Sequence, residues 1–209
     1  MLETNNFLKN ALLKLLCFLP LMGTLRKGIE EESNVYDERS IYRFEVRDMN
    51  KNEYKLDKYR GDVIIIVNVA SKCKLANKSY KELSELLKRH SDKGLRILLF
   101  PCSQFLDQEY EELAEIKAFA DKYNEEFILM DKVEVKGNNI HPLFEFLVEE
   151  LPGTFGNYIK WNFTYFLIDR NGIPVRRYSP TGSITPKDKY LLKVLNESPA
   201  NEPANNYAL

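Results

Sequence analysis

Cys73 is the side chain in this sequence that is best placed to act as a nucleophile. It follows the β-branched run Val63–Val69 and precedes a segment with helical periodicity. Ligands bind at the carboxyl ends of strands in open α/β sheets, and the N-terminus of a helix stabilises a thiolate beside it. Lys72 and Lys74 favour the same negatively charged form. A thiolate at this position would need no histidine to activate it.

The small number of cysteines and histidines restricts the chemistry further. Three cysteines and two histidines are too few for a disulfide scaffold or a histidine-rich metal site. A dithiol oxidoreductase needs a second thiol three residues after the first, and that position holds Ala76. A single reactive thiol remains, although the position of Cys73 alone is equally consistent with an inert, buried cysteine.

Composition limits the class of protein. The 209 residues include 30 lysines and arginines and 31 aspartates and glutamates, so no nucleic-acid partner is expected. Hydrophobic residues make up 44% of the chain, which excludes an intrinsically disordered protein. The length fits one domain with tails.

The two ends of the chain differ from its middle. Residues 1–39 combine a hydrophobic leader, uncharged from Leu15 to Leu25, with a charged linker, and residues 196–209 form a polar tail. The uncharged run is too short to span a bilayer but suits the apolar region of a signal peptide. The leader therefore suggests the secretory pathway, with a mitochondrial or other organelle presequence, an interfacial anchor and a cytoplasmic location as alternatives. Residues 40–195 form the predicted working domain.

Residues 40–195 alternate between strand and helix patterns. An Asn171-Gly172 turn predicts a hairpin, and Thr185-Pro186 is expected to begin the last helix. Strands are predicted at Ile41–Val46, Tyr54–Leu56, Val63–Val69, Arg96–Phe100, Tyr165–Asp169 and Ile173–Tyr178, a strand or loop at Phe127–Val135, and helices around Tyr80–Leu87, Leu113–Tyr123, Leu143–Leu151 and Leu191–Leu195. This order predicts an α/β protein with a thioredoxin-like fold, a central mixed sheet flanked by helices, and an extra N-terminal β-hairpin.

Three separated motifs resemble those of the glutathione peroxidase family. They are VNVASKC at Val67–Cys73, FPCSQF at Phe100–Phe105 followed by Gln108-Glu109, and KWNFTYFL at Lys160–Leu167. They occur in the family's order, and the resemblance covers nearly all of residues 40–195. It implies a thiol-dependent peroxidase that protects against oxidative stress, with cysteine where other members have selenocysteine.

The resemblance implies a catalytic tetrad of Cys73, Gln108, Trp161 and Asn162. The Cys73 thiolate would attack the distal oxygen of a hydroperoxide, leaving a sulfenic acid and releasing an alcohol or water. The other three side chains can each donate a hydrogen bond to the thiolate and the departing oxygen without adding charge. Taken singly, Trp161 could be a core anchor, Gln108 a solvated loop residue and Asn162 a glycosylation acceptor. Neither a bound cofactor nor a metal ion is expected.

The chain departs from the family pattern beside these residues. Glycine is usual where this chain has Lys74 and Leu106, while Ala76, Ser79 and Tyr110 replace threonine, asparagine and proline. A side chain in place of glycine removes backbone freedom and adds bulk near the substrate. The resemblance therefore implies the basic reaction more directly than it implies how the peroxide enters, how the reducing thiol docks or how fast the enzyme turns over.

The segment Pro152–Lys160 is short, whereas tetrameric members of the family carry a longer segment there. The resemblance is thus to the phospholipid-hydroperoxide type, which is a monomer with an open, flat site. It implies hydrogen peroxide and organic or lipid hydroperoxides as substrates, and transient contact with a membrane surface.

The sequence says less about the reductant than about the hydroperoxide substrate. Many cysteine members carry a resolving cysteine in the stretch corresponding to Phe119–Tyr123, which has none here. Cys17 lies in the leader, and Cys102 is expected to pack at the end of a strand. These features favour glutathione or another small thiol as co-substrate over a thioredoxin-like reductant. The alternative function is a redox sensor or oxidative-folding partner that passes oxidation from Cys73 to another protein.

Overall fold

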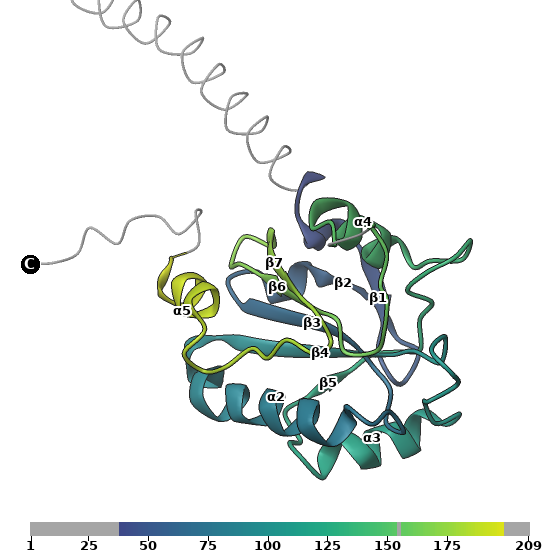
Figure 1. The fold of residues 1–209 in the computed structure, drawn as a ribbon. Coiled ribbons are helices and arrows are strands. Elements are labelled where there is room, and N and C mark those ends of the chain that lie inside the picture. Colours follow the sequence, from purple (N-terminus) through teal and green to yellow (C-terminus); the bar gives the residue numbers. More distant parts are fainter. Residues whose placement is uncertain (1–37, 154–155, 199–209) are drawn as a thin grey trace, which may run out of the picture. The chain divides into compact units, whose positions relative to one another are not determined.

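A five-stranded mixed sheet forms the centre of the computed structural model, which describes residues 38–153 and 156–198 (Figure 1). β3 is parallel to β4 and β4 to β5, whereas β6 is antiparallel to both β3 and β7. The strands, in spatial order, are β5 (Ile128–Leu129), β4 (Leu95–Pro101), β3 (Val63–Val69), β6 (Tyr165–Ile168) and β7 (Pro174–Tyr178). The predicted mixed sheet is confirmed.

β3 is the central strand of the sheet, and all seven of its residues are buried. Its valines and isoleucines suit a strand covered on both faces, because β-branched side chains pack well on a pleated surface. β3 and β4 pair in parallel along their whole length. Both strands therefore end at the same edge of the sheet, where the chain continues into the loops that carry Cys73 and Gln108.

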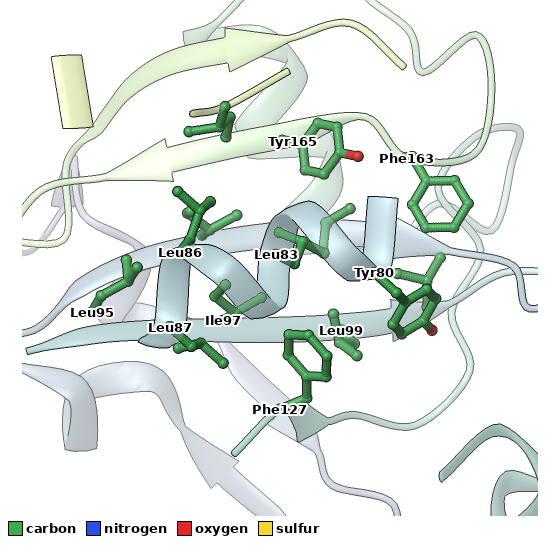
Figure 2. Packing of buried hydrophobic residues seen from close by; sticks show 14 of the residues in the cluster. Tyr80, Leu83, Leu86, Leu87, Leu95, Ile97, Leu99, Phe127, Phe163 and Tyr165 are labelled. Carbon is green, nitrogen blue, oxygen red and sulfur yellow. The ribbon is translucent and has the colours of Figure 1, made fainter. Parts of the chain in front are cut away.

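Helices cover both faces of the sheet (Figure 1). α2 (Ala76–His90), α3 (Leu113–Asp121) and α5 (Lys189–Asn196) pack on one face. The other face is covered by α4 (Pro142–Glu150) and by the antiparallel hairpin of β1 (Glu45–Arg47) and β2 (Glu53–Lys55). Figure 2 shows the first of these layers, in which apolar side chains of α2 pack among those of β4 and β6. The helices and the N-terminal hairpin predicted from the sequence are all present.

The hairpin of β6 and β7 turns at Asn171-Gly172, as predicted. Gly172 has a φ of +79°, and a Cβ atom there would lie 2.8 Å from the Tyr42 ring. The left-handed backbone and the close approach of Tyr42 both require glycine. The Ile41 N–H also donates to the Gly172 carbonyl at 2.9 Å, so this turn fixes the start of the domain.

Two local predictions were wrong. Ile41–Arg43 is a 3-10 helix instead of the first half of a strand, because the Ser40 hydroxyl accepts the Tyr42 N–H and caps it. The last helix begins at Lys189 instead of at Thr185-Pro186. There the Asp188 carboxylate accepts two backbone N–H groups of the first turn, at 2.9 and 3.0 Å.

The predictions of a hydrophobic leader and a polar tail fall almost wholly on residues 1–37 and 199–209, which lie outside the described residues. Within the described ranges, every helix is too short or too polar to cross a bilayer.

Candidate active site

Three segments meet at the edge of the sheet where β3 and β4 end. They are the loop between β3 and α2, the loop between β4 and α3, and residues 160–164, which lead into β6. β6 is antiparallel to β3, with Tyr165 opposite Val67, so its amino end lies beside the carboxyl end of β3. The topology thereby brings together the segments that carry all four predicted site residues.

Cys73 lies in a tight turn just before α2, as the sequence predicted. Its N–H donates to the Ala70 carbonyl at 3.2 Å, and its own carbonyl accepts the Ala76 N–H at 2.9 Å. The residue is 6% exposed and its thiol is free, while Lys72 and Lys74 on either side are exposed. The cysteine is thus held by backbone contacts, with cationic side chains at the surface beside it.

Gln108 lies in the loop between β4 and α3 and bonds to both of the other segments. Its carbonyl accepts the Lys72 N–H at 2.8 Å, and its side-chain Oε1 accepts a hydrogen bond from Asn162 Nδ2 at 3.2 Å. Asn162 is completely buried, and its Oδ1 has no hydrogen-bond partner within the described residues. Burial excludes the alternative that Asn162 is a glycosylation acceptor in the folded protein. The bond to Asn162 also distinguishes Gln108 from a merely solvated loop residue.

Trp161 is half-buried and lies between the two hydrophobic clusters of the domain. Cys73 belongs to one of these clusters, and the centroid of the Phe105 ring in the other lies 5.6 Å from that of Trp161. The indole therefore has a packing role, as the alternative supposed, and remains partly accessible beside Asn162. The catalytic roles of Cys73, Gln108, Trp161 and Asn162 stay predictions.

Asn68 was not singled out from the sequence, yet it shapes the segment before β6. Its Oδ1 accepts the Thr164 N–H at 3.0 Å, and its Nδ2 donates to the Trp161 carbonyl at 3.3 Å. Its backbone carbonyl accepts the N–H of Phe163, which has a φ of +63°. A lone amide within the β-branched strand Val63–Val69 was the signal that could have identified this residue.

Glu109 is the second residue whose place at the site was missed. Its side chain is 2% exposed, and its Oε1 accepts the N–H groups of Ser71 at 2.9 Å and Tyr110 at 2.8 Å. Burial raises the pKa of Glu109, although these hydrogen bonds and Lys132 act in the opposite direction. The sequence showed only that a glutamate follows Gln108.

Glu109 is expected to make the stability of the protein fall as pH rises. A carboxyl with a raised pKa binds its proton more tightly in the folded than in the unfolded chain. Its favourable contribution is therefore complete below the unfolded pKa and is lost as pH rises through the folded pKa. Urea unfolding between about pH 4 and about pH 8 should show wild type losing stability relative to Glu109→Gln. A difference between the two proteins that is constant with pH would contradict this assignment.

No group of three or more histidine, cysteine, aspartate or glutamate side chains suited to a metal ion occurs among residues 38–153 and 156–198. The site instead offers one thiol, two amides and an indole. Such a set can supply a nucleophile and neutral hydrogen-bond donors to an oxygen that gains negative charge.

Comparison with known proteins agrees with this description. Residues 41–148 match the family model for glutathione peroxidase. A probable phospholipid hydroperoxide glutathione peroxidase of Mesembryanthemum crystallinum is 45% identical over 161 residues, which cover 77% of this chain and 95% of the relative. A glutathione peroxidase of Schistosoma mansoni is 50% identical over 143 residues, covering 68% and 85%.

Comparison with solved structures also shows similarity to a glutathione peroxidase. The crystal structure of T. cruzi GPX1 matches with a TM-score of 0.62 at 38% identity, covering 75% of this chain and 96% of that one. A thioredoxin family protein of Chlorobium tepidum TLS matches with a TM-score of 0.53 at 14% identity, covering 73% and 92%, which confirms the thioredoxin-like fold. By its family model, its relatives and its structural neighbours, this chain is a member of the glutathione peroxidase family of enzymes.

Proposed function

We propose that this protein is a thiol-dependent peroxidase whose reacting group is Cys73. The Cys73 thiolate attacks the distal oxygen of a hydroperoxide and the O–O bond breaks. A proton completes the departing alcohol, or water when hydrogen peroxide reacts, and the sulfur is left as a sulfenic acid. The observation that carries the proposal is the double connection of Gln108, by its backbone to the Cys73 loop and by its side chain to Asn162.

The neighbouring side chains suit the charge that develops in this reaction. Negative charge moves from the thiolate to the departing oxygen, and neutral donors fixed in a buried site stabilise it at both positions. The amides of Gln108 and Asn162 and the indole of Trp161 are such donors. The redox-sensor and folding-partner alternatives gain no support from the family relatives, which are named as peroxidases.

The positions of the thiols support a cycle that uses one cysteine. The described residues contain Cys73 and Cys102, neither of them in a disulfide, and Cys102 is completely buried. Burial also raises the pKa of the Cys102 thiol, which disfavours the thiolate that an attack on the sulfenic acid requires. A small thiol then condenses with the sulfenic acid to give a mixed disulfide and water. A second thiol displaces Cys73 and leaves as the oxidised disulfide.

The test is consumption of hydrogen peroxide by the purified full chain with glutathione or with reduced thioredoxin as the electron donor. Multiple turnovers with glutathione are expected, at a rate that exceeds the rate with thioredoxin. Turnover with thioredoxin alone would overturn the choice of reductant. Absence of hydroperoxide consumption with every thiol tested would overturn the peroxidase itself.

The surface beside the site supports lipid hydroperoxides as substrates and contact with a membrane surface. Leu106 is 76% exposed and directly follows Phe105, whose ring packs on Trp161. The ammonium of Lys136 lies 4.3 Å from the centroid of the Phe105 ring, and Lys72 is exposed beside Cys73. An exposed apolar side chain on a surface that also carries lysines fits the boundary between anionic headgroups and acyl chains. A monomer keeps this face open.

Replacing Leu106 with glycine should weaken membrane contact without loss of stability. Leu106 has a φ of +58°, a conformation that costs an ordinary residue about 1 kcal/mol and that glycine adopts freely. Loss of the apolar side chain should reduce binding to anionic phosphatidylserine vesicles by about 5- to 10-fold. The rate on vesicle-held lipid hydroperoxide should fall relative to the rate on hydrogen peroxide.

Leu106→Met is the matched control, since it keeps an apolar side chain at the same point. It should bind vesicles as wild type does. Equal binding by the glycine variant would show that Leu106 does not enter the lipid.

A further inference from the structure

Two hydrogen bonds join the loop after β3 to the loop after β4, directly before the reacting cysteine. The Lys72 N–H donates to the Gln108 carbonyl at 2.8 Å, and the Ser71 N–H donates to Glu109 Oε1 at 2.9 Å. The first bond is between backbone groups, which any residue type could form. The second depends on the side chain of Glu109 and is therefore specified by the sequence.

The Glu109 carboxyl is held rigidly. Besides Ser71, its Oε1 accepts the N–H of Tyr110 at 2.8 Å, and only 2% of the residue is exposed. A carboxyl that accepts two backbone N–H groups in a buried position has little freedom to move. Burial of a carboxyl is unfavourable unless its oxygens are hydrogen-bonded, and here Oε1 is bonded while Oε2 has no partner among the described residues.

The second oxygen of this carboxyl belongs to a group of three buried oxygens. Glu109 Oε2, the Ser71 hydroxyl and the Tyr80 hydroxyl are all buried and have no hydrogen-bond partner of good geometry within the described residues. The three groups nevertheless lie close enough to influence one another, since the charge of Glu109 and the Ser71 hydroxyl both affect the pKa of Tyr80. Tyr80 lies in the first turns of α2, beside Leu99 of β4 (Figure 2). A polar cluster thus underlies the loop of Cys73.

The cluster also contacts the segment that carries Trp161 and Asn162. The rings of Tyr80 and Phe163 meet edge to face with centroids 6.0 Å apart, and Phe163 directly follows Asn162. Glu109 itself directly follows Gln108. The carboxyl thus bonds to the Cys73 loop, belongs to the loop of Gln108, and reaches the third segment only indirectly, through Tyr80.

From these contacts we infer that Glu109 is a positioning residue, which sets the turn before Cys73 and so aligns its sulfur with the donors of Gln108, Trp161 and Asn162. This inference rests on the proposed peroxidase function. Glu109 touches neither the hydroperoxide nor the sulfur in this role, and it acts through Ser71.

The inference separates two reactions of the same thiol. Attack on a hydroperoxide needs the sulfur to be aligned with groups that stabilise the departing oxygen. Alkylation by iodoacetamide needs a thiolate that the reagent can reach, but no oxygen departs in it, so it depends on only one of the two effects of those donors. Loss of alignment should therefore slow the first reaction much more than the second.

The experiment uses the full chain of wild type, Glu109→Ala, Glu109→Gln and Glu109→Asp. Trp161 is the single tryptophan, so its fluorescence can follow the oxidation of Cys73 by hydrogen peroxide in a stopped-flow instrument. Alkylation of the Cys73 peptide by iodoacetamide is measured by mass spectrometry on the same samples. Glu112→Ala is the matched control, because the side chain of Glu112 is exposed and makes no capping bond to α3.

Glu109→Ala should lose about 100-fold in the rate with hydrogen peroxide, the effect of a misplacement of roughly 1 Å. Its alkylation should fall by no more than about threefold, because that reaction has no departing oxygen for the donors to stabilise. Glu109→Gln keeps an oxygen acceptor for the Ser71 N–H and should restore the hydroperoxide rate to within about fivefold of wild type. The control should react as wild type does in both assays.

Glu109→Asp keeps the carboxyl but withdraws it by one methylene. If the alanine variant fails to fold, this variant tests whether Glu109 positions the Cys73 loop. It should lose hydroperoxide reactivity while alkylation persists. Wild-type hydroperoxide rates in folded Glu109→Ala and Glu109→Asp, or equal loss in both reactions, would overturn the positioning role. A wild-type protein that is alkylated but not oxidised at Cys73 would instead overturn the peroxidase function.

Discussion

Replacement of Cys73 by serine is expected to abolish peroxide turnover, with a loss of at least about 10³-fold. A serine hydroxyl stays protonated in the place of a thiolate and cannot form a stable oxidised intermediate on its oxygen. The measurement is consumption of hydrogen peroxide and of a lipid hydroperoxide with glutathione in excess. Mass spectrometry of the oxidised protein should show the sulfenic acid, or its mixed disulfide with glutathione, on the Cys73 peptide of wild type.

Cys102→Ser provides the matched control for this experiment. Cys102 is completely buried after β4, and the proposed cycle does not use it. This variant should turn over peroxide as wild type does. Undiminished turnover by Cys73→Ser, or loss of turnover by Cys102→Ser alone, would place the reacting thiol elsewhere.

Replacement of Asn162 by alanine is expected to have the next largest effect on catalysis. It removes a buried amide donor and the 3.2 Å hydrogen bond to Gln108 Oε1. Removal of one fixed donor to a developing oxyanion typically lowers rates by about 10²- to 10³-fold. The rate of Cys73 oxidation by hydrogen peroxide should fall by this amount, while the reduction of the oxidised enzyme by glutathione should change far less.

Asn157→Ala tests whether the effect is specific, because Asn157 is exposed and lies outside the three loops of the site. It should oxidise at the wild-type rate. An Asn162→Ala protein that is folded and oxidised as fast as wild type would show that the buried amide takes no part in the reaction.

Much of the fold followed from local patterns, and the two exceptions each combine a local helix cap with a more distant contact. The buried strand Val63–Val69 and the turn at Asn171-Gly172 were predicted because residue type decides the structure there. Ile41–Arg43 was mistaken for a strand, since its start depends on a bond from Ile41 to Gly172, far along the chain. Asp188 likewise caps the last helix while accepting a hydrogen bond from Tyr178. The Ser40 and Asp188 caps are local features that were overlooked, whereas the contacts with Gly172 and Tyr178 leave no signal in nearby residues.

The same distinction applies to the site. Cys73 was identified from its place between a strand and a helix, whereas Gln108 and Asn162 were identified from motifs of the family. Asn68 and Glu109 were missed because each acts on residues remote in sequence. The bond from Ser71 to Glu109 spans 38 positions, and the bond from Thr164 to Asn68 spans 96. Residue types alone do not show which distant backbone groups a side chain will meet.

The anchoring of the segment before β6 to Asn68 has a consequence for motion at the site. The N–H groups of Phe163 and Thr164 bond to the central, buried strand of the sheet, so we expect them to exchange slowly with solvent. The segment that carries Trp161 and Asn162 is thereby held close to the core of the domain. If the proposed function holds, we expect adjustment to hydroperoxides of different size to come from the rim, where Leu106 and Asp107 lie exposed in a left-handed backbone. The proposed peroxidase would then accept a range of substrates without movement of the residues around Cys73.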